Sequence, residues 1–201
     1  MATALVAAAI APVASSCGAT TKSGRARLSA RFVERTTALV AGDTIHMRTV
    51  GGFDWTSRIG WSVNTTAGTP GATVRIIQIK DACYERFGAG QWTRSGAAGS
   101  ACGDEAPDNP ATLAKTFHAV ASSWKRVGPA LVDGVPTTHY AGSMHIGAAV
   151  AGPFELWLDK QGVVRRLTAK SNFHGRTVSR LDYYDFGVKV RVKAPSLEGA
   201  N

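Results

Sequence analysis

Residues 154–169 read FELWLDKQGVVRRLTA, which is the pattern of a β-hairpin. Phe154, Leu156 and Leu158 recur at every second position, as expected for a strand that buries one face. The Asp-Lys-Gln-Gly sequence that follows favours a turn, and the β-branched run beginning at Val163 favours the returning strand. This part of the chain therefore predicts antiparallel strands joined by a tight turn.

The same signals recur on both sides of this hairpin. Thr73–Ile79 (TVRIIQI) is β-branched and apolar, and Asp133-Gly134 has the composition of a two-residue hairpin turn. Gly and Pro are scattered along the chain, which favours many short strands. Strands are predicted at residues 27–34, 44–50, 59–64, 73–79, 82–87, 91–94, 127–132, 135–146, 154–158, 163–169, 176–184 and 188–193.

One helix is predicted, between Asn109 and Gly128. Asn109 is a favourable cap, Pro110 suits the first turn, and the Gly-Pro pair that begins at Gly128 ends the pattern. Apolar side chains recur in between with helical spacing and would share one face: Leu113, Phe117, Val120 and Trp124. Such a stripe is typical of a helix that packs on a sheet.

The 201 residues fit a single domain of the α+β class with a leader. No internal repeat or linker divides the chain, so the domain is expected to span residues 25–195, with a short tail at 196–201. An antiparallel sheet with one helix is expected to bury the apolar stripe of that helix against one of its faces.

The amino-terminal segment decides the predicted compartment. Residues 1–16 contain the uncharged, mostly apolar run ATALVAAAIAPVA, which is too short to span a bilayer but fits the apolar part of a signal peptide. Small residues precede Cys17, and residues 17–24 are small and polar, so the site resembles a bacterial lipobox, whose cysteine is diacylated. A diacylated Cys17 would tether the protein to the extracytoplasmic side of the cell membrane.

Two alternatives to a lipoprotein leader stay open. The segment could be another type of export signal, or an Ala-rich helix that happens to contain a cysteine. Lys and Arg are absent between Met1 and Cys17, so we expect the natural start of a signal peptide to lie upstream.

Cys83 and Cys102 are predicted to form a disulfide. An exported protein meets an oxidising compartment, and both cysteines lie beside turn-forming residues. With Cys17 acylated, the three cysteines would supply one anchor and one disulfide. The alternative is a pair of buried free thiols, since cysteine is also a small core residue.

The net charge of +9 raises the question of a nucleic-acid partner. The basic residues are spread thinly, with the densest group at Arg25, Arg27 and Arg31, and no nucleic-acid-binding motif is present. We therefore expect no nucleic-acid partner, and instead an attraction to anionic lipid surfaces.

No arrangement of residues in the sequence indicates an enzyme, a metal site or a cofactor. Ser143 lacks the G-x-S-x-G turn of a nucleophile elbow, and Gly96–Gly103 lacks a phosphate-loop signature. His139 and His145 are about 20 Å apart along one predicted strand and cannot share a metal ion. The sequence therefore predicts a binding protein that acts as a monomer without a cofactor.

An ordered set of motifs extends through residues 28–195. The most specific are D-G-V-x-T-x-x-Y at Asp133–Tyr140, W-L-D-x-x-G at Trp157–Gly162 and the terminal D-F-G at Asp185–Gly187. In order and spacing they resemble the LppX/LprG type of bacterial lipoprotein, which has the LolA-like fold. The resemblance implies an unclosed, strongly curved antiparallel sheet, a half-barrel, with a helix packed on its concave side and an apolar cavity between them.

The resemblance further implies a protein that binds or transfers a lipid or glycolipid in the cell envelope. The residues expected to line the cavity lie on the helix and on two strands: Ile77, Ile79, Leu113, Phe117, Val120, Trp124, Leu156 and Leu158. The pattern alone leaves open whether these side chains line a cavity or form ordinary core. An alternative on the same fold is an envelope protein-interaction or stress-sensing module without a stored lipid.

Overall fold

The computed structural model describes residues 28–69, 72–95, 108–145, 151–172 and 176–197. These segments form one helix and the strands of a single sheet. In chain order the elements are β1 (Ser29–Val40), β2 (Asp43–Asp54), β3 (Ile59–Thr66), β4 (Thr73–Ile79), β5 (Ala82–Phe87), β6 (Thr93–Ser95), α2 (Pro110–Val120), β7 (Ala121–Val132), β8 (Val135–His145), β9 (Ala151–Leu158), β10 (Val164–Ser171) and β11 (Arg176–Tyr184).

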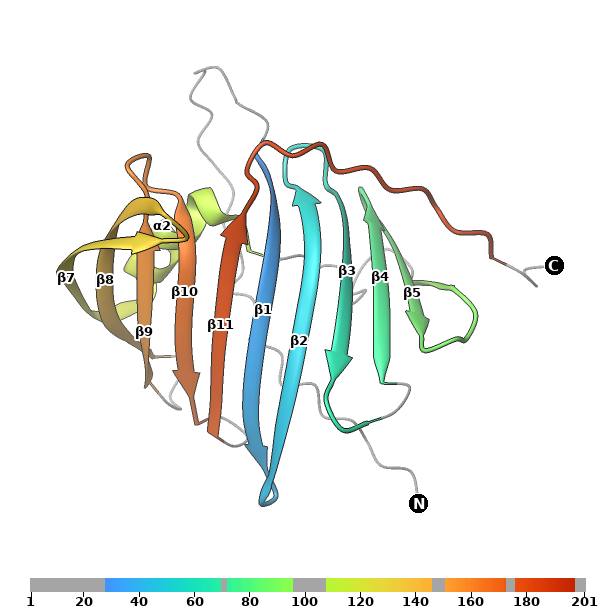
Figure 1. Ribbon diagram of the computed structural model, residues 1–201, viewed down its shortest axis with the longest axis horizontal. Coiled ribbons are helices and arrows are strands. Elements are labelled where there is room, and N and C mark those ends of the chain that lie inside the picture. Colours follow the sequence, from blue (N-terminus) through green and yellow to red (C-terminus); the bar gives the residue numbers. More distant parts are fainter. Residues whose placement is uncertain (1–27, 70–71, 96–107, 146–150, 173–175, 198–201) are drawn as a thin grey trace.

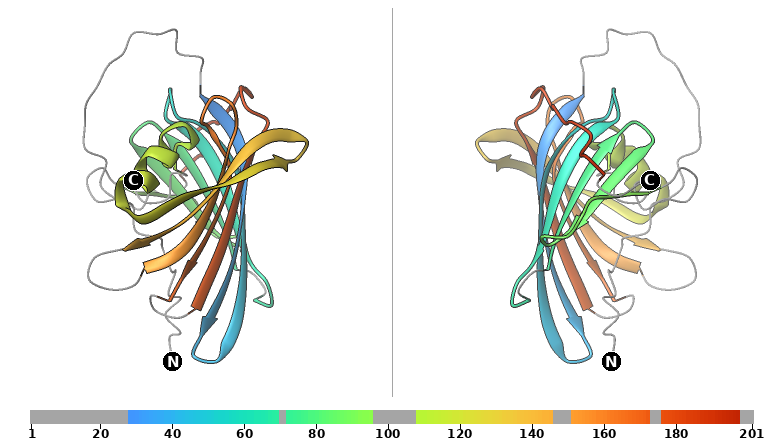
Figure 2. Two further views of the ribbon diagram at one scale, coloured as in Figure 1. Left: turned by 90° about the vertical axis from the view of Figure 1, so that its left-hand side faces the viewer. Right: turned by 90° about the vertical axis from the view of Figure 1, so that its right-hand side faces the viewer.

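The sheet has eleven antiparallel strands in the order β6-β5-β4-β3-β2-β1-β11-β10-β9-β8-β7. Strands that follow one another in the chain pair with each other within each half, and pairing of β1 with β11 joins the two halves. The first and last strands therefore lie at the centre, and the edges β6 and β7 stay apart. The sheet is strongly curved, and α2 lies on its concave side, behind the sheet in Figure 1 and beside it in Figure 2.

Local sequence sets the start of α2 as predicted, but not its end. The Asn109 side chain accepts a hydrogen bond from the Ala111 amide at 3.0 Å, and Pro110 occupies the first turn. The helix ends at Val120, because the backbone becomes extended at the next residue and begins β7. Trp124 therefore lies on a strand, and its assignment to the helix was wrong.

Pairing with β8 accounts for the early end of the helix. Trp124 pairs with Gly142, and the Ser143 amide donates a hydrogen bond of 3.0 Å to the Ser123 hydroxyl. A helix continued to residue 127 would lose this strand pairing. The spacing of apolar residues did not reveal the change, because Trp124 points toward the same cluster from the strand as it would from a helix.

The strand predicted at residues 188–193 is also not formed. After Tyr184 the chain leaves the sheet and runs past the ends of the neighbouring strands (Figure 1). Its departure is fixed at Ser29, whose carbonyl accepts a hydrogen bond from the Gly187 amide at 2.8 Å and whose hydroxyl donates one to the Val188 carbonyl at 2.7 Å. The alternating sequence here thus specifies an extended segment without a partner strand.

Three glycines allow phenylalanine rings to lie directly on the concave face. One is Gly60 on β3, opposite Phe53 on β2, and the other two lie opposite rings of one buried cluster. Phe154 on β9 pairs with Gly142 on β8, and Phe32 on β1 pairs with Gly51 on β2. A Cβ atom at either glycine would collide with the ring of its partner. Both rings are buried, so glycine at these positions permits the close packing of the core.

Candidate functional site

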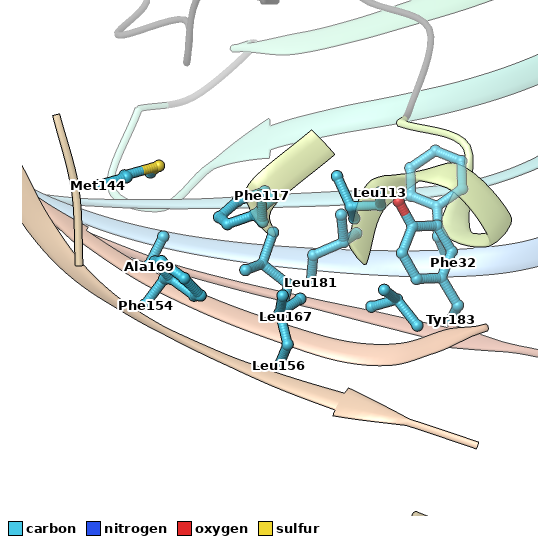
Figure 3. Close-up of a cluster of buried hydrophobic side chains, with 11 residues drawn as sticks. Phe32, Leu113, Phe117, Met144, Phe154, Leu156, Leu167, Ala169, Leu181 and Tyr183 are labelled. Carbon is cyan, nitrogen blue, oxygen red and sulfur yellow. The ribbon is translucent and has the colours of Figure 1, made fainter. Parts of the chain in front are cut away.

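The larger apolar part of the concave face lies on β8–β11 and β1, under α2. Strand alternation and register bring Leu156, Leu167 and Leu181 side by side on β9, β10 and β11. All three are buried in one cluster, which we call the helix–sheet cluster (Figure 3). Its buried members are Phe32, Leu113, Phe117, Met144, Phe154, Leu156, Val164, Leu167, Ala169, Leu181 and Tyr183.

The helix contributes Leu113 and Phe117 to this cluster. Both side chains point toward the sheet (Figure 3) and are only 3% and 8% exposed. The Phe117 ring meets the Phe154 ring edge-on, with centroids 5.0 Å apart. The inner face of α2 is therefore closely packed on the sheet at these positions.

The rim of the cluster is less completely buried. We use the name rim for Val120, Trp124 and Leu158, which pack against the cluster and are partly buried. The Trp124 ring lies 5.7 Å from the Phe154 ring and 5.2 Å from the Tyr140 ring, measured between centroids. Apolar surface therefore reaches solvent at Val120 and Trp124, where α2 passes into β7, and at Leu158, whose partner Thr138 lies four residues along β8 from Gly142, the partner of Trp124.

The structure brings together six of the eight residues expected to line a cavity. Three are buried in the cluster and three form its rim: Leu113, Phe117 and Leu156, and then Val120, Trp124 and Leu158. Their close packing fits ordinary core at the buried positions, and their role as ligand contacts stays a prediction.

Ile77 and Ile79 do not join this group. The register connects buried Phe32 on β1, through β2 and β3, with Ile76 on β4. Ile76 therefore takes the concave face, and Ile77 and Ile79 lie on the convex one. The prediction selected the wrong face of this strand, because the sequence TVRIIQI places apolar side chains on both faces.

A second part of the concave face, near the centre of the sheet, is polar and was not expected from the sequence. Glu34 on β1 and Ser179 on β11 point to this face, as do Ser62 on β3 and Gln78 on β4. Ser62, Gln78 and Ser179 are buried, and Glu34 is half-buried. The available signal was the alternation of β1, in which Glu34 follows buried Phe32 at an inward position.

Glu34 has a perturbed acidity in this environment. Burial raises the pKa of its carboxyl above the ordinary value, and the nearby Asp108 raises it further. Opposing this, the Thr36 hydroxyl donates a hydrogen bond of 3.3 Å to the carboxylate. Burial also raises the pKa of Tyr183 well above its usual value, and the charges of Asp108 and Glu34 add to this effect. The Tyr183 hydroxyl therefore stays protonated, and it donates a hydrogen bond of 2.7 Å to the Asp108 carbonyl.

Replacing Glu34 by glutamine is expected to stabilise the protein at neutral pH. The folded state raises the pKa of Glu34, so the unfolding free energy of the natural chain falls as the pH rises through that pKa. Glutamine has no such charge and can still accept the Thr36 hydrogen bond. Urea unfolding should show the gain of the Glu34→Gln variant at pH 7 shrinking toward pH 4.

A matched variant separates this effect from a general loss of negative charge. Glu155 lies on the convex face with its side chain 49% exposed, so Glu155→Gln should not show the same pH-dependent gain. An equal gain in both variants, or a gain at Glu34 that persists unchanged at acid pH, would contradict the role assigned to burial.

Of the three cysteines, the structure describes Cys83, whereas Cys17 and Cys102 lie outside the described segments. Cys83 is fully buried on β5 and packs with Ile76. The lipid anchor at Cys17 and the Cys83–Cys102 disulfide therefore stay predictions.

Within the described segments, no three His, Cys, Asp or Glu side chains gather in a way that could hold a metal ion. His139 instead stacks on Trp157, with ring centroids 4.4 Å apart.

The helix α2 has eleven residues, and no helix in the part of the chain that the structure describes is long and apolar enough to cross a membrane.

Sequence comparison relates the chain distantly to a lipoprotein. No family model matches it. The Streptomyces coelicolor protein named "Putative lipoprotein SCO4650" is 25% identical over 205 residues, which cover 88% of this chain and 69% of that protein.

Structural comparison gives similarity over more than four-fifths of the chain. The crystal structure of the Mycobacterium tuberculosis lipoprotein LppX matches with a TM-score of 0.59 at 16% identity, covering 83% of this chain and 90% of LppX. LprF from Mycobacterium bovis matches with a TM-score of 0.54 at 11% identity, covering 85% of this chain and 90% of LprF. The predicted α+β, LolA-like half-barrel is thus confirmed, and the chain has the fold of the lipoproteins LppX and LprF.

Proposed function

We propose that this protein is a lipoprotein of the cell envelope that binds or transfers a lipid or glycolipid. The observation that carries the proposal is the apolar contact between α2 and the concave sheet, with its partly open rim, in a chain of the LppX fold. Sequence similarity to a protein named as a lipoprotein supports the envelope location. Cys17 would hold the domain on the extracytoplasmic side of the cell membrane, and we expect a monomer without a cofactor.

An acyl chain would bind along the rim, beside Val120, Trp124 and Leu158. These side chains are already partly buried by the helix–sheet cluster, so a bound chain would cover their remaining apolar surface. Burial of each methylene contributes about 0.8 kcal/mol, and about ten methylenes would contribute about 8 kcal/mol before the costs of association. A longer chain would require α2 to move outward from Leu156 and Phe154, since the cluster beneath it is packed.

A tryptophan at Val120 is expected to abolish lipid binding with little effect on folding. Val120 lies at the end of α2 and is only partly buried, so a larger side chain can extend along the rim in place of an acyl chain. Native mass spectrometry of the purified protein should show co-purified lipid, and Val120→Trp should lose it. The melting temperature should change little, whereas overpacking a filled core usually costs about 1–3 kcal/mol.

The neighbouring residue provides a matched control. Ala119 is on the outer, exposed face of α2, so Ala119→Trp adds a similar volume away from the rim and should keep the lipid. The proposal fails if the natural chain carries no lipid after mild purification and takes up none from vesicles. It also fails if Val120→Trp melts much lower yet retains its lipid, since the rim would then be ordinary core.

A further inference from the structure

The convex face of the sheet carries an arginine row that strand pairing creates. Arg35 on β1 pairs directly with Arg48 on β2 and, on its other side, with Arg180 on β11. Neighbouring strands are about 4.8 Å apart, so three guanidinium groups start from backbone positions within about 10 Å. Like charges directly opposite one another destabilise a sheet, and this arrangement therefore points to a role other than folding.

One buried carboxylate only partly compensates this charge. Asp182 on β11 is 6% exposed at its side chain and forms ion pairs with Arg35 at 3.4 Å, with Arg180 at 2.9 Å and with Arg166. Arg166 also pairs with Asp133 at 3.7 Å, whereas Arg35 and Arg180 share the one carboxylate of Asp182. Arg48 has no ion-pair partner among the described residues. The row therefore keeps a net positive charge. The ion pairs with Asp182 hold the side chains of Arg35 and Arg180 in position.

Further basic residues enlarge this charged surface. Arg166 and Lys170 on β10 and Arg176 on β11 share the convex face with the row. We call these three residues together with the arginine row the basic face. It covers the four central strands β2, β1, β11 and β10, which face the viewer in Figure 1 on the side opposite to α2. The side chains of Arg35 and Arg180 are 54% and 46% exposed, so their remaining N–H groups can reach a partner.

We propose that the basic face docks the protein on the phosphate groups of an anionic phospholipid bilayer. Guanidinium groups bind phosphate oxygens through paired hydrogen bonds, and basic residues near an anionic bilayer each add to the affinity. The surface is broad and convex rather than a groove, which suits contact with many headgroups instead of enclosure of one ligand. Trp157 on β9 also lies on this side of the sheet, and tryptophan favours the membrane interface.

This inference rests on the proposed tether at Cys17, which would keep the domain beside a bilayer, but it concerns a different face from the lipid-binding rim. Docking by the basic face would turn the concave side and α2 away from the membrane to which the face is bound. The two proposals can therefore fail separately: loss of docking leaves co-purified lipid unchanged, and loss of rim binding leaves docking unchanged.

The test is co-sedimentation of the 201-residue chain carrying Cys17→Ser, so that no acyl anchor contributes. The vesicles contain phosphatidylcholine with about 30 mol% phosphatidylglycerol, and binding should disappear between about 0.05 M and about 0.5 M NaCl. Arg48→Gln with Arg180→Gln should weaken binding about fivefold per arginine, or about 25-fold in all. Arg35 and Arg166 stay in place in this double variant, so Asp182 keeps two partners.

A control variant removes the same charge elsewhere. Lys115 is exposed on α2, and Lys160 is exposed in the turn between β9 and β10. Lys115→Gln with Lys160→Gln should weaken binding by about twofold at most, because both lie away from the basic face. Equal losses in the two double variants would overturn the proposal, as would equal binding to vesicles of phosphatidylcholine alone. Tighter binding to duplex DNA than to the anionic vesicles at the same salt concentration would overturn it in favour of a nucleic-acid surface.

Discussion

Replacing Phe154 by alanine is expected to lower the free energy of unfolding by about 3–5 kcal/mol. Phe154 is 1% exposed and lies on Gly142. Its ring also contacts those of Phe117 on α2 and Trp124 on β7. Truncation would leave a void that neither neighbour can fill without leaving its own position, and Gly142 has no side chain to replace the lost contacts. The free energy of unfolding therefore falls for two reasons: the burial of the ring away from water is lost, and the void left behind lacks packing contacts.

The measurement is urea unfolding at neutral pH, followed by circular dichroism and by tryptophan fluorescence. Phe87 on β5 provides the control, since it is the same residue type in the same sheet but 62% exposed. Phe87→Ala should change the unfolding free energy by less than about 1 kcal/mol. A similar, small change in both variants would mean that α2 and the sheet do not form the core of the domain.

Local patterns in the sequence specified most of the strands and the start of the helix. The hairpin at residues 154–169 follows from strict alternation and a turn sequence, and the structure forms it as β9 and β10. Asn109 and Pro110 likewise act through hydrogen bonds within a few residues. Features of this kind depend on neighbours in the chain, so one sequence is enough to predict them.

Features that depend on distant pairing could not be predicted in the same way. Arg35, Arg48 and Arg180 look scattered in the sequence, and only the pairing of the first strand with the last brings them into a row. The polar surroundings of Glu34 depend on the same central pairing, which places Ser179 beside Thr36. Along the sequence the basic residues are spread thinly, whereas strand register gathers several of them on the convex face.

The residues predicted to line the cavity include both correct and incorrect placements. Leu113, Phe117 and Leu156 were placed correctly because their spacing has one clear period. Trp124 kept its inward direction although it lies on a strand, and Ile77 was assigned to the wrong face because its strand is apolar on both sides. The spacing of apolar residues therefore predicts which way a side chain points only where one face of the helix or strand is apolar and the other is polar.

Replacing Cys17 by serine is expected to move the protein from the membrane fraction to the soluble fraction of a bacterial host. A single acyl chain anchors a protein only marginally, whereas the two chains of a diacylated cysteine give stable attachment. Serine keeps the size of the side chain but provides no thiol for acylation. Ser16→Ala is the matched control, because it keeps a small residue before Cys17 and should leave the protein in the membrane fraction.

The fractions need to be washed with about 1 M NaCl before the comparison, since the basic face would otherwise retain unanchored protein on anionic lipid through charge alone. After this wash, immunoblotting should find the natural chain and Ser16→Ala in the membrane and Cys17→Ser in the supernatant. Mass analysis of the mature amino-terminal peptide should show a diacylglyceryl group on Cys17 in the first two. Retention of Cys17→Ser after the wash, or an unmodified Cys17 in the natural chain, would exclude the lipoprotein anchor. The docking of the basic face, if it persisted at low salt in the same variant, would then be the attachment that the fold itself provides.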